Sequence, residues 1–240
     1  MPRVPKIRLT DKTNSDIIYI TKFVEALMID LHTHTLFSDG ELLPSELVRR
    51  AEVKGYKAIA LTDHVDSSNI DFVIPRIVNI CKTLNRNWKI RSIPGVEITH
   101  APLKEIRPLV KFARKAGAKI VIVHGETISE PVIPGTNRAA IEAGCDILAH
   151  PGNITKKEIV LARANGVCLE LTARKSHSLP NKRLFGLARS IGAKLVLNTD
   201  AHSSKDLISD AQARKILKGI GLKEAEIRQV FKNSEVLAKG

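Results

Sequence analysis

Residues 27–40 read LMIDLHTHTLFSDG, an apolar run that ends directly in two histidines and is followed by a carboxylate. If the backbone is extended here, His32 and His34 point the same way and can both bind one metal ion from the end of a strand. Short His-x-His pairs also occur on ordinary exposed strands, so this stretch alone leaves both interpretations open. The rest of the chain decides between them.

Apolar, β-branched runs alternate with amphipathic segments from residue 28 onward. We predict strands at 28–32, 58–62, 90–97, 119–124, 146–150, 166–172 and 194–199, and helices at 44–54, 72–84, 104–116, 136–143, 155–165, 182–191, 205–217 and 223–231. This alternation is typical of a parallel sheet with crossover helices. Many of the helical segments end in a glycine suited to a left-handed cap, and Asp39 or Ser45, Thr155 and Ser204 are candidate N-caps.

Seven strand–helix units in a chain of 240 residues close more easily into a barrel than into an open sheet. We therefore predict one α/β domain, a distorted (β/α)7 barrel similar to a TIM barrel. Residues 1–27 form an N-terminal extension in this prediction, residues 28–220 form the barrel, and residues 221–240 form a C-terminal helix packed on it.

Composition narrows the class of partner. No apolar run approaches the roughly 20 residues that cross a bilayer, and no signal-peptide core follows Met1, so we expect a soluble, cytoplasmic protein without a membrane partner. The formal charge of +13 favours phosphorylated or polyanionic partners. However, Lys and Arg are dispersed, and two tyrosines and one tryptophan offer few stacking platforms, so a small phosphorylated substrate is favoured over nucleic acid. The oligomeric state does not follow from the sequence.

Six of the eight histidines lie at or just beyond the carboxyl end of a predicted strand. The third strand ends in Glu97, the seventh runs into Asp200, and Asp39 follows the first. In a parallel barrel these ends form the face on which active sites are built. The candidate metal ligands are therefore His32, His34, Asp39, His64, Glu97, His124, His150, Asp200 and His202. A lone histidine of this kind is usually a core residue, but the whole set is hard to obtain by chance.

Histidine and carboxylate ligands without cysteine suit zinc, manganese or iron. At roughly three protein ligands per catalytic ion, this set supports two or three divalent ions. Ions that share a bridging carboxylate can bind a hydroxide and a phosphoryl group together, which favours metal-activated water as the nucleophile in phosphate ester hydrolysis. Asp63, beside His64, is expected to orient a ligating imidazole, while His100 is expected to lie outside the ligand shell.

The sixth predicted strand ends in ELTARKSH, residues 170–177, and supplies cations where the other strands supply ligands. Arg174 is a candidate for binding a phosphate oxygen, with Lys175 or His177 nearby. His177 is alternatively a general acid that protonates the leaving alkoxide. A solvated basic loop is the competing interpretation.

The motifs DLHTHTLFSDG, ALTDH, GVE, HGE, AHPG and NTDAH together resemble the PHP (polymerase and histidinol phosphatase) superfamily of metal-dependent phosphoesterases, over residues 28–207. The resemblance implies a similar distorted barrel, with Glu97 as the bridging and catalytic acid. It implies one ion on His32, His34, Glu97 and Asp200, a second on Glu97, His124 and His150, and a third on Asp39, His64 and His202. Some trinuclear members carry histidine where this chain has Asp39, which leaves the third position open.

The resulting hypothesis is a metal-dependent phosphatase acting on a phosphate monoester, with histidinol phosphate as the substrate the family suggests. Arg174 and His177 join Glu97 as the catalytic residues in this hypothesis, and Lys175 assists in substrate binding. Two alternatives remain open: a nucleotidase or nuclease acting on nucleotide phosphoesters, and a non-catalytic accessory barrel.

Overall fold

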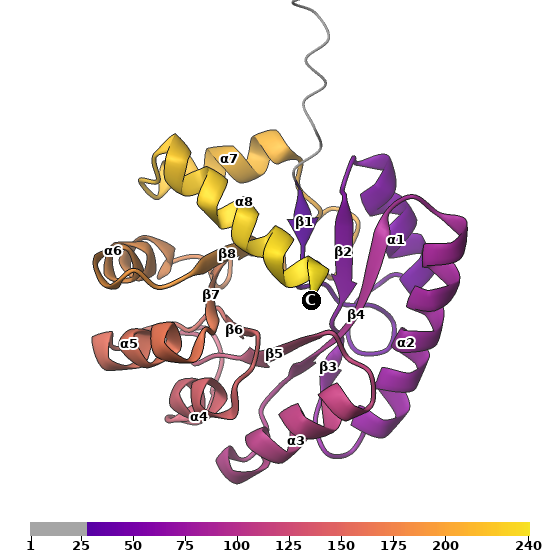
Figure 1. Cartoon of the computed structure of the whole chain (residues 1–240), viewed down its shortest axis with the longest axis horizontal. Helices are drawn as coiled ribbons and strands as arrows, with labels where there is room; N and C mark the ends of the chain where they lie inside the picture. The colour runs from indigo at the N-terminus through magenta and orange to yellow at the C-terminus, as the bar shows by residue number, and fades with distance from the viewer. Residues whose placement is uncertain (1–27) are drawn as a thin grey trace, which may run out of the picture.

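A computed structural model describes residues 28–240, so the predicted extension at residues 1–27 lies outside the described part (Figure 1). One parallel sheet runs in the order β1-β2-β4-β5-β6-β7-β8, with β3 paired to β4. The strands are β1 (Ile29–Asp30), β2 (Ala58–Leu61), β3 (His64–Val65), β4 (Arg91–Ile98), β5 (Ile120–His124), β6 (Ile147–Ala149), β7 (Cys168–Thr172) and β8 (Leu195–Asn198).

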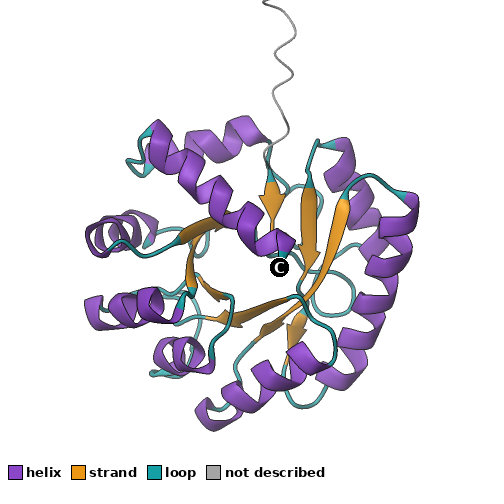
Figure 2. Cartoon of the chain, in the orientation of Figure 1, coloured by secondary structure: helices purple, strands orange, loops and turns teal. Residues whose placement is uncertain are grey.

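The sheet curls until its two edges meet. Beyond the ends of β1 and β8, Thr33 bridges Ala201 in parallel register, and the amide of Asp200 donates to the carbonyl of His32 at 3.0 Å. Helices surround this nearly closed barrel, as Figure 2 shows. The predicted TIM-like α/β barrel is therefore confirmed, and each of the seven predicted strands is present.

The sequence did not predict β3. After β2 the chain turns at Thr62 and Asp63, and β3 then pairs with the second half of β4, where His64 lies opposite Glu97. The first half of β4 pairs with β2 instead. This shift of partner along one long strand brings two candidate ligands side by side.

Eight helices follow the strands among the described residues: α1 (Pro44–Val53), α2 (Ile70–Asn87), α3 (Leu103–Lys115), α4 (Thr136–Ala143), α5 (Lys156–Asn165), α6 (Asn181–Ile191), α7 (Asp210–Gly219) and α8 (Glu224–Lys239). The glycines predicted to end helices have positive φ angles. Thr155 is confirmed as an N-cap, in a capping box with Glu158.

The other N-cap predictions were wrong. Leu43 precedes α1, and Pro44 opens the helix with the φ angle that a first turn needs, so neither Asp39 nor Ser45 caps it. Ser209, not Ser204, caps α7, because residues before it form the loop that carries His202 toward the barrel mouth.

Two apolar layers hold the barrel together. One fills the interior, with Leu31, Ile93 and Ile122 among its members, and the other lies between the sheet and the helices. Ala238 of α8 belongs to the interior layer, and Asn233 of α8 donates to the carbonyl of Leu195 at 2.8 Å. Since Leu195 begins β8, α8 covers the amino end of the barrel, where Figure 1 shows it crossing the opening.

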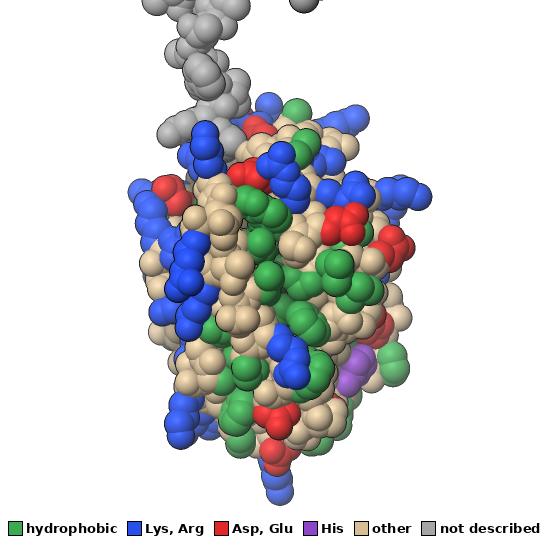
Figure 3. All heavy atoms as spheres, turned by 90° about the vertical axis from the view of Figure 1, so that its right-hand side faces the viewer, with side chains coloured by type: hydrophobic (Ala, Val, Ile, Leu, Met, Phe, Trp, Pro, Cys, Tyr) green, Lys and Arg blue, Asp and Glu red, His purple; other side chains and the backbone are tan. Residues whose placement is uncertain are grey.

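One face of the molecule shows how its basic side chains are distributed. On the face shown in Figure 3, Lys and Arg side chains lie scattered over the surface and around its edge, with no single basic block. Among residues 28–240, no helix combines the length and apolar character needed to cross a bilayer.

Candidate metal centre

The carboxyl ends of the strands bring all nine predicted ligands to one place. His32 and His34 follow β1, His64 belongs to β3, Glu97 to β4 and His124 to β5. The other four lie in the loops that follow β1, β6 and β8. Their ring and carboxylate atoms form overlapping groups in which one atom from each residue lies within 4.8 Å of the others.

The first group contains His32, His34 and Glu97, and Asp200 lies beside it. Nε2 of His32 lies 3.1 Å from Oε2 of Glu97, and Nε2 of His34 lies 3.1 Å from Oδ1 of Asp200. The crossed pairs, His34 with Glu97 and His32 with Asp200, are 3.6 and 3.7 Å apart. Two imidazoles and two carboxylates therefore lie close together at the ends of β1, β4 and β8.

The second and third groups flank the first. Glu97, His124 and His150 form one, in which Nε2 of His150 lies 3.8 Å from Oε1 of Glu97. The other contains His34, Asp39, His64 and His202, in which Asp39 lies 3.1 Å from Nε2 of His202 and 3.6 Å from Nε2 of His64. These two groups contain the second and third ligand sets that the family resemblance implied, with His34 as an additional member of the third. Asp200 instead groups with His150 and His177, and a fifth group contains His32, His150 and Glu170, so the assignment of residues to individual ions stays a prediction.

Backbone strain is concentrated at the same site. His100, His150 and Asp200 are the non-glycine residues with positive φ among residues 28–240, and all three line the cavity over the ligands. This conformation is costly for side chains of their size and usually persists where the surrounding structure requires a particular side-chain direction.

Several buried atoms of the site lack hydrogen-bond partners. They are Nε2 of His32, both ring nitrogens of His34, both oxygens of Glu97, Nδ1 of His150 and Oε1 of Glu170. Oε2 of Glu97 lies 3.1 Å from Nε2 of His32 and 2.8 Å from Nδ1 of His64, but neither contact has the geometry of a hydrogen bond. A buried polar atom without a partner is expensive, so native proteins rarely leave one unsatisfied. Lone pairs on imidazole and carboxylate groups are what zinc, manganese or iron would use, so the residues present fit divalent metal ions.

Burial and the charges of neighbouring groups shift the pKa values of the cluster, some upward and some downward. Burial alone would lower the pKa of His32, but Glu97, Glu170 and Asp200 outweigh it and hold this pKa well above the ordinary value. Burial and the neighbouring rings of His64 and His32 keep the pKa of His34 well below it. Burial, assisted by Glu97, raises the pKa of Asp200 to about 7.

Glu170 and Asp63, two residues that support the ligands, make contacts other than those we predicted from the sequence. Glu170 on β7 is fully buried and lies 2.8 Å from Nδ1 of His32, so the sixth predicted strand does supply a carboxylate to the site. Asp63 does not contact a ligating imidazole, because its carboxylate accepts hydrogen bonds from Thr35 and Ser38 and so fixes the turn before Asp39. Nδ1 of His64 instead meets Thr99 and Glu97, at 2.6 and 2.8 Å.

The predicted substrate-binding residues divide between two positions. Arg174 lines the cavity over the ligands, where its Nη1 donates to the carbonyl of Asp200 at 3.0 Å and lies 2.8 Å from Nδ1 of His202. His177 is buried in the same cavity wall, 3.9 Å from Oδ2 of Asp200. Lys175 is exposed and lines a neighbouring cavity, not the cavity over the ligands.

Glu130 is a charged residue of the site that sequence reasoning missed. Its carboxylate lies 3.2 Å from His124, 3.3 Å from His100 and 3.5 Å from His177. It stands in the loop between β5 and α4, several residues beyond the strand end, where position along the chain gave no signal. His100 thus lies beside the ligand shell, held by Glu130.

A family model described as the PHP domain matches residues 30–166, which is more than half of the chain. The chain belongs to the PHP-domain family. An uncharacterized protein of Methanocaldococcus jannaschii is 45% identical over 207 residues, which cover 85% of this chain and 95% of that protein. Ribonuclease P protein component 3 of Methanosarcina barkeri is 30% identical over 204 residues, covering 78% of this chain and 79% of that one.

Solved structures share the PHP-domain fold at low sequence identity. A chain in the cryo-EM structure of archaeal ribonuclease P with mature tRNA has a TM-score of 0.69 and 18% identity, covering 88% of this chain and 90% of that one. Histidinol phosphate phosphatase from Lactococcus lactis, solved with zinc, L-histidinol and phosphate, has a TM-score of 0.58 and 19% identity, covering 81% of this chain and 94% of that one. At these identities, both structural similarities support the fold alone.

Proposed function

We propose that this PHP-domain protein is a metal-dependent phosphatase that hydrolyses phosphate monoesters. The observation that carries the proposal is the set of buried, unpartnered imidazole and carboxylate atoms beneath a cavity whose wall holds Arg174. A purely structural cluster would be expected to satisfy these atoms internally. These unpartnered atoms are more numerous than the ligands of a single ion, which favours two or three ions.

The proposed ligand sets are those that the family resemblance implied, and the residues of each set lie close together in the structure. His32, His34, Glu97 and Asp200 would hold one ion, Glu97, His124 and His150 a second, and Asp39, His64 and His202 a third. When bound, zinc, manganese or iron would supply a hydroxide nucleophile near neutral pH and offset charge on the phosphoryl oxygens. Glu97 is fully buried between two sets, which suits a carboxylate shared by two ions.

Arg174 is the proposed phosphate-binding residue. Its contacts with Asp200 and His202 fix the guanidinium at the cavity wall, while its side chain remains one-third exposed. Guanidinium groups bind phosphate oxygens through parallel N–H bonds, so this placement orients the ester without using a metal ligand.

His177 has a supporting role in the proposal. Its Nδ1 lies 2.7 Å from the hydroxyls of both Thr127 and Ser129, which fixes the ring with Nε2 toward the cavity. Burial, with His124 and Arg174 nearby, lowers the pKa of His177. The ring is therefore neutral at neutral pH, which favours hydrogen bonding to substrate over proton donation to the leaving alkoxide.

The test is phosphate release from a panel of monoesters, histidinol phosphate included, with manganese or zinc added. We expect turnover by the wild type and loss of at least ~100-fold in His34→Ala, because a metal ligand is removed. Glu105→Gln, an exposed change on α3, is the control and should match the wild type. Equal rates in His34→Ala and the wild type, or no release from any ester, would refute the proposal.

A role with RNA is the second candidate, favoured by the formal charge of +13 and by the relative named as a ribonuclease P component. Binding or cleavage of single-stranded RNA that weakens steeply with salt would support it, since polyanion binding releases counterions. A purified protein without bound zinc, manganese or iron would favour a non-catalytic role.

A further inference from the structure

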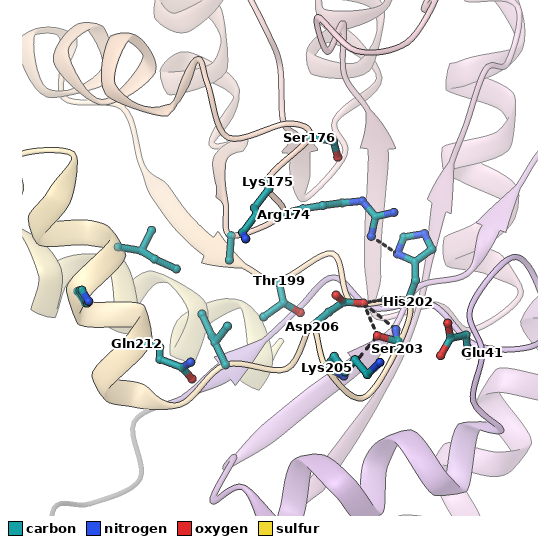
Figure 4. Close-up of a pocket in the computed structure, with 14 residues that line it drawn as sticks. Glu41, Arg174, Lys175, Ser176, Thr199, His202, Ser203, Lys205, Asp206 and Gln212 are labelled. Atoms are coloured by element: carbon teal, nitrogen blue, oxygen red, sulfur yellow. Dashed lines mark hydrogen bonds between the residues drawn. The ribbon is translucent and has the colours of Figure 1, made fainter.

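A second, larger cavity adjoins the one over the candidate ligands. The cavity over the ligands has a volume of about 240 Å³ and its neighbour about 820 Å³, and Arg174 and His202 line both. Figure 4 shows the larger cavity, with Arg174 reaching toward His202 on one side and Gln212 of α7 on the other. The organic part of an ester held by Arg174 would have this cavity beside it.

Three lysines stand on the wall of the larger cavity. Lys175 follows Arg174, Lys205 lies in the loop between β8 and α7, and Lys215 belongs to α7. All three are exposed, and none of them forms an ion pair with a residue of the described range 28–240. Their charge is therefore available to a ligand.

Two carboxylates share this wall, and one is already engaged. Oδ2 of Asp206 accepts hydrogen bonds from the amides of His202 and Ser203 and from the Ser203 hydroxyl, at 3.0, 2.8 and 2.9 Å. Glu41 is exposed at the edge near His202, as Figure 4 shows. With Arg174 included, four cationic groups face two carboxylates, so the cavity carries net positive charge.

The uncharged part of the lining is aliphatic. Ala173, Ile208 and Ile216 contribute to it, and no Phe, Tyr or Trp occurs among the described residues that line the cavity. Sites for single-stranded nucleic acid usually stack bases on aromatic side chains. The lining fits an aliphatic anion better than a nucleobase.

We propose that the substrate is a phosphate monoester whose leaving group carries a second anionic group, a phosphate or a carboxylate, bound by Lys175, Lys205 and Lys215. This inference rests on the proposed phosphatase function and names its substrate class. Hydrolysis breaks the bond between phosphorus and the ester oxygen, water supplies the new oxygen on phosphorus, and a proton passes to the leaving oxygen. The products are inorganic phosphate and an alcohol that retains the second anionic group. An amino alcohol such as L-histidinol would bring an ammonium group toward the lysines.

The experiment compares three esters built on one alkyl chain: pentyl phosphate, aminopentyl phosphate and pentanediol bisphosphate. With the manganese-loaded full chain, we expect kcat/KM to be about tenfold higher for the bisphosphate than for pentyl phosphate, mainly through KM, and lower again for the amine. Because the two phosphates of the bisphosphate are equivalent, its kcat/KM is divided by two before the comparison.

Lysine variants test whether the residues of the larger cavity cause the preference for the bisphosphate. In the double variant K205A/K215A, the ratio of kcat/KM for the bisphosphate to that for pentyl phosphate should fall toward one, and K215A alone should give an intermediate ratio. Lys218→Ala is the matched control, since Lys218 also lies on α7 but outside the cavity, 3.7 Å from Glu224, and it should keep the wild-type ratio.

The possible failures are distinguishable. Equal kcat/KM for the bisphosphate and pentyl phosphate, a preference for aminopentyl phosphate, or an unchanged ratio in K205A/K215A would overturn this inference and leave the phosphatase proposal intact. Faster cleavage of a terminally phosphorylated single-stranded RNA would overturn it in favour of a polymer. No hydrolysis of any ester would remove the proposed function and this inference together.

Discussion

Nδ1 of His32 lies 2.8 Å from Oε2 of Glu170, a carboxylate 138 residues further along the chain. Glu170 also accepts a hydrogen bond from Asn198 at 2.8 Å, so the carboxylate itself is held in place. A partner of this kind fixes the tautomer and direction of a ligating imidazole and raises its basicity. In this geometry Nε2 of His32 is the nitrogen left for a metal ion.

Glu170→Gln should therefore weaken metal binding without removing a proposed ligand. We expect the dissociation constant for zinc or manganese to rise by about 10- to 100-fold, because the amide keeps the size of the side chain but loses its charge. Competition with a chelator of known affinity measures this constant. Glu105→Gln should leave it unchanged, and an unchanged constant in Glu170→Gln would show that the contact is only structural.

Metal binding should release protons at neutral pH. In the metal-free protein, Glu97, Glu170 and Asp200 keep His32 protonated above its usual range, and burial raises the pKa of Asp200 to about 7. Metals bind the deprotonated forms, so apparent affinity should increase as pH rises through this range. Calorimetric titration with manganese in buffers of different ionisation enthalpy measures the protons released. Proton uptake, or affinity that falls with rising pH, would contradict this expectation.

Arg174→Ala should reduce kcat/KM for phosphate monoesters by about 10- to 100-fold, because one charge-assisted contact with phosphate is lost. Arg174→Lys should recover only part of this, since a single ammonium cannot form two parallel bonds. Inhibition by inorganic phosphate is an independent readout and should weaken in the same order. If both variants retain wild-type inhibition, Arg174 does not bind phosphate.

Gly152 and Gly144 form a matched pair that tests the backbone around His150. Both have positive φ, +56° and +76°, but a Cβ on Gly152 would lie 1.8 Å from the carbonyl oxygen of Glu126, whereas nothing lies within 4 Å of one on Gly144. Gly144→Ala should cost roughly 1–2 kcal/mol of unfolding free energy from conformation alone. Gly152→Ala should cost clearly more, because the backbone of Glu126 in the loop after β5 must also shift.

Urea unfolding of the two variants measures the difference. Gly152→Ala should also lose phosphatase activity, since the displaced residues lie next to His124, while Gly144→Ala should retain it. If the two variants lose the same unfolding free energy, the turn after β6 can accommodate a Cβ at Gly152 without strain.

Much of the architecture could be predicted from the sequence because it depends on local sequence patterns. Buried parallel strands are continuous apolar runs, and the ligands follow them directly, so strand ends and candidate ligands were found together. The glycine after α4 and the Thr155 cap of α5 are equally local signals. Each depends on residues within one or two turns.

The missed features depend on register between distant segments. β3 exists because β4 is long enough to pair with two segments in succession, and Glu170 reaches His32 only once the barrel closes. Asp63 was assigned to an imidazole because His64 is its neighbour in sequence, but in the structure it binds the turn at residues 35–38. Glu130 enters the site from a loop, where spacing from the strand carries no information.

The central claim is that the barrel mouth gathers these side chains into a multinuclear metal site. Anomalous diffraction from crystals grown with manganese and phosphate tests it most directly. We predict two or three manganese peaks, one between His34 and Asp200, one beside Glu97 and His150, and the third, if filled, near Asp39, with phosphate next to Arg174. Crystals that hold no manganese in this cluster would contradict the claim.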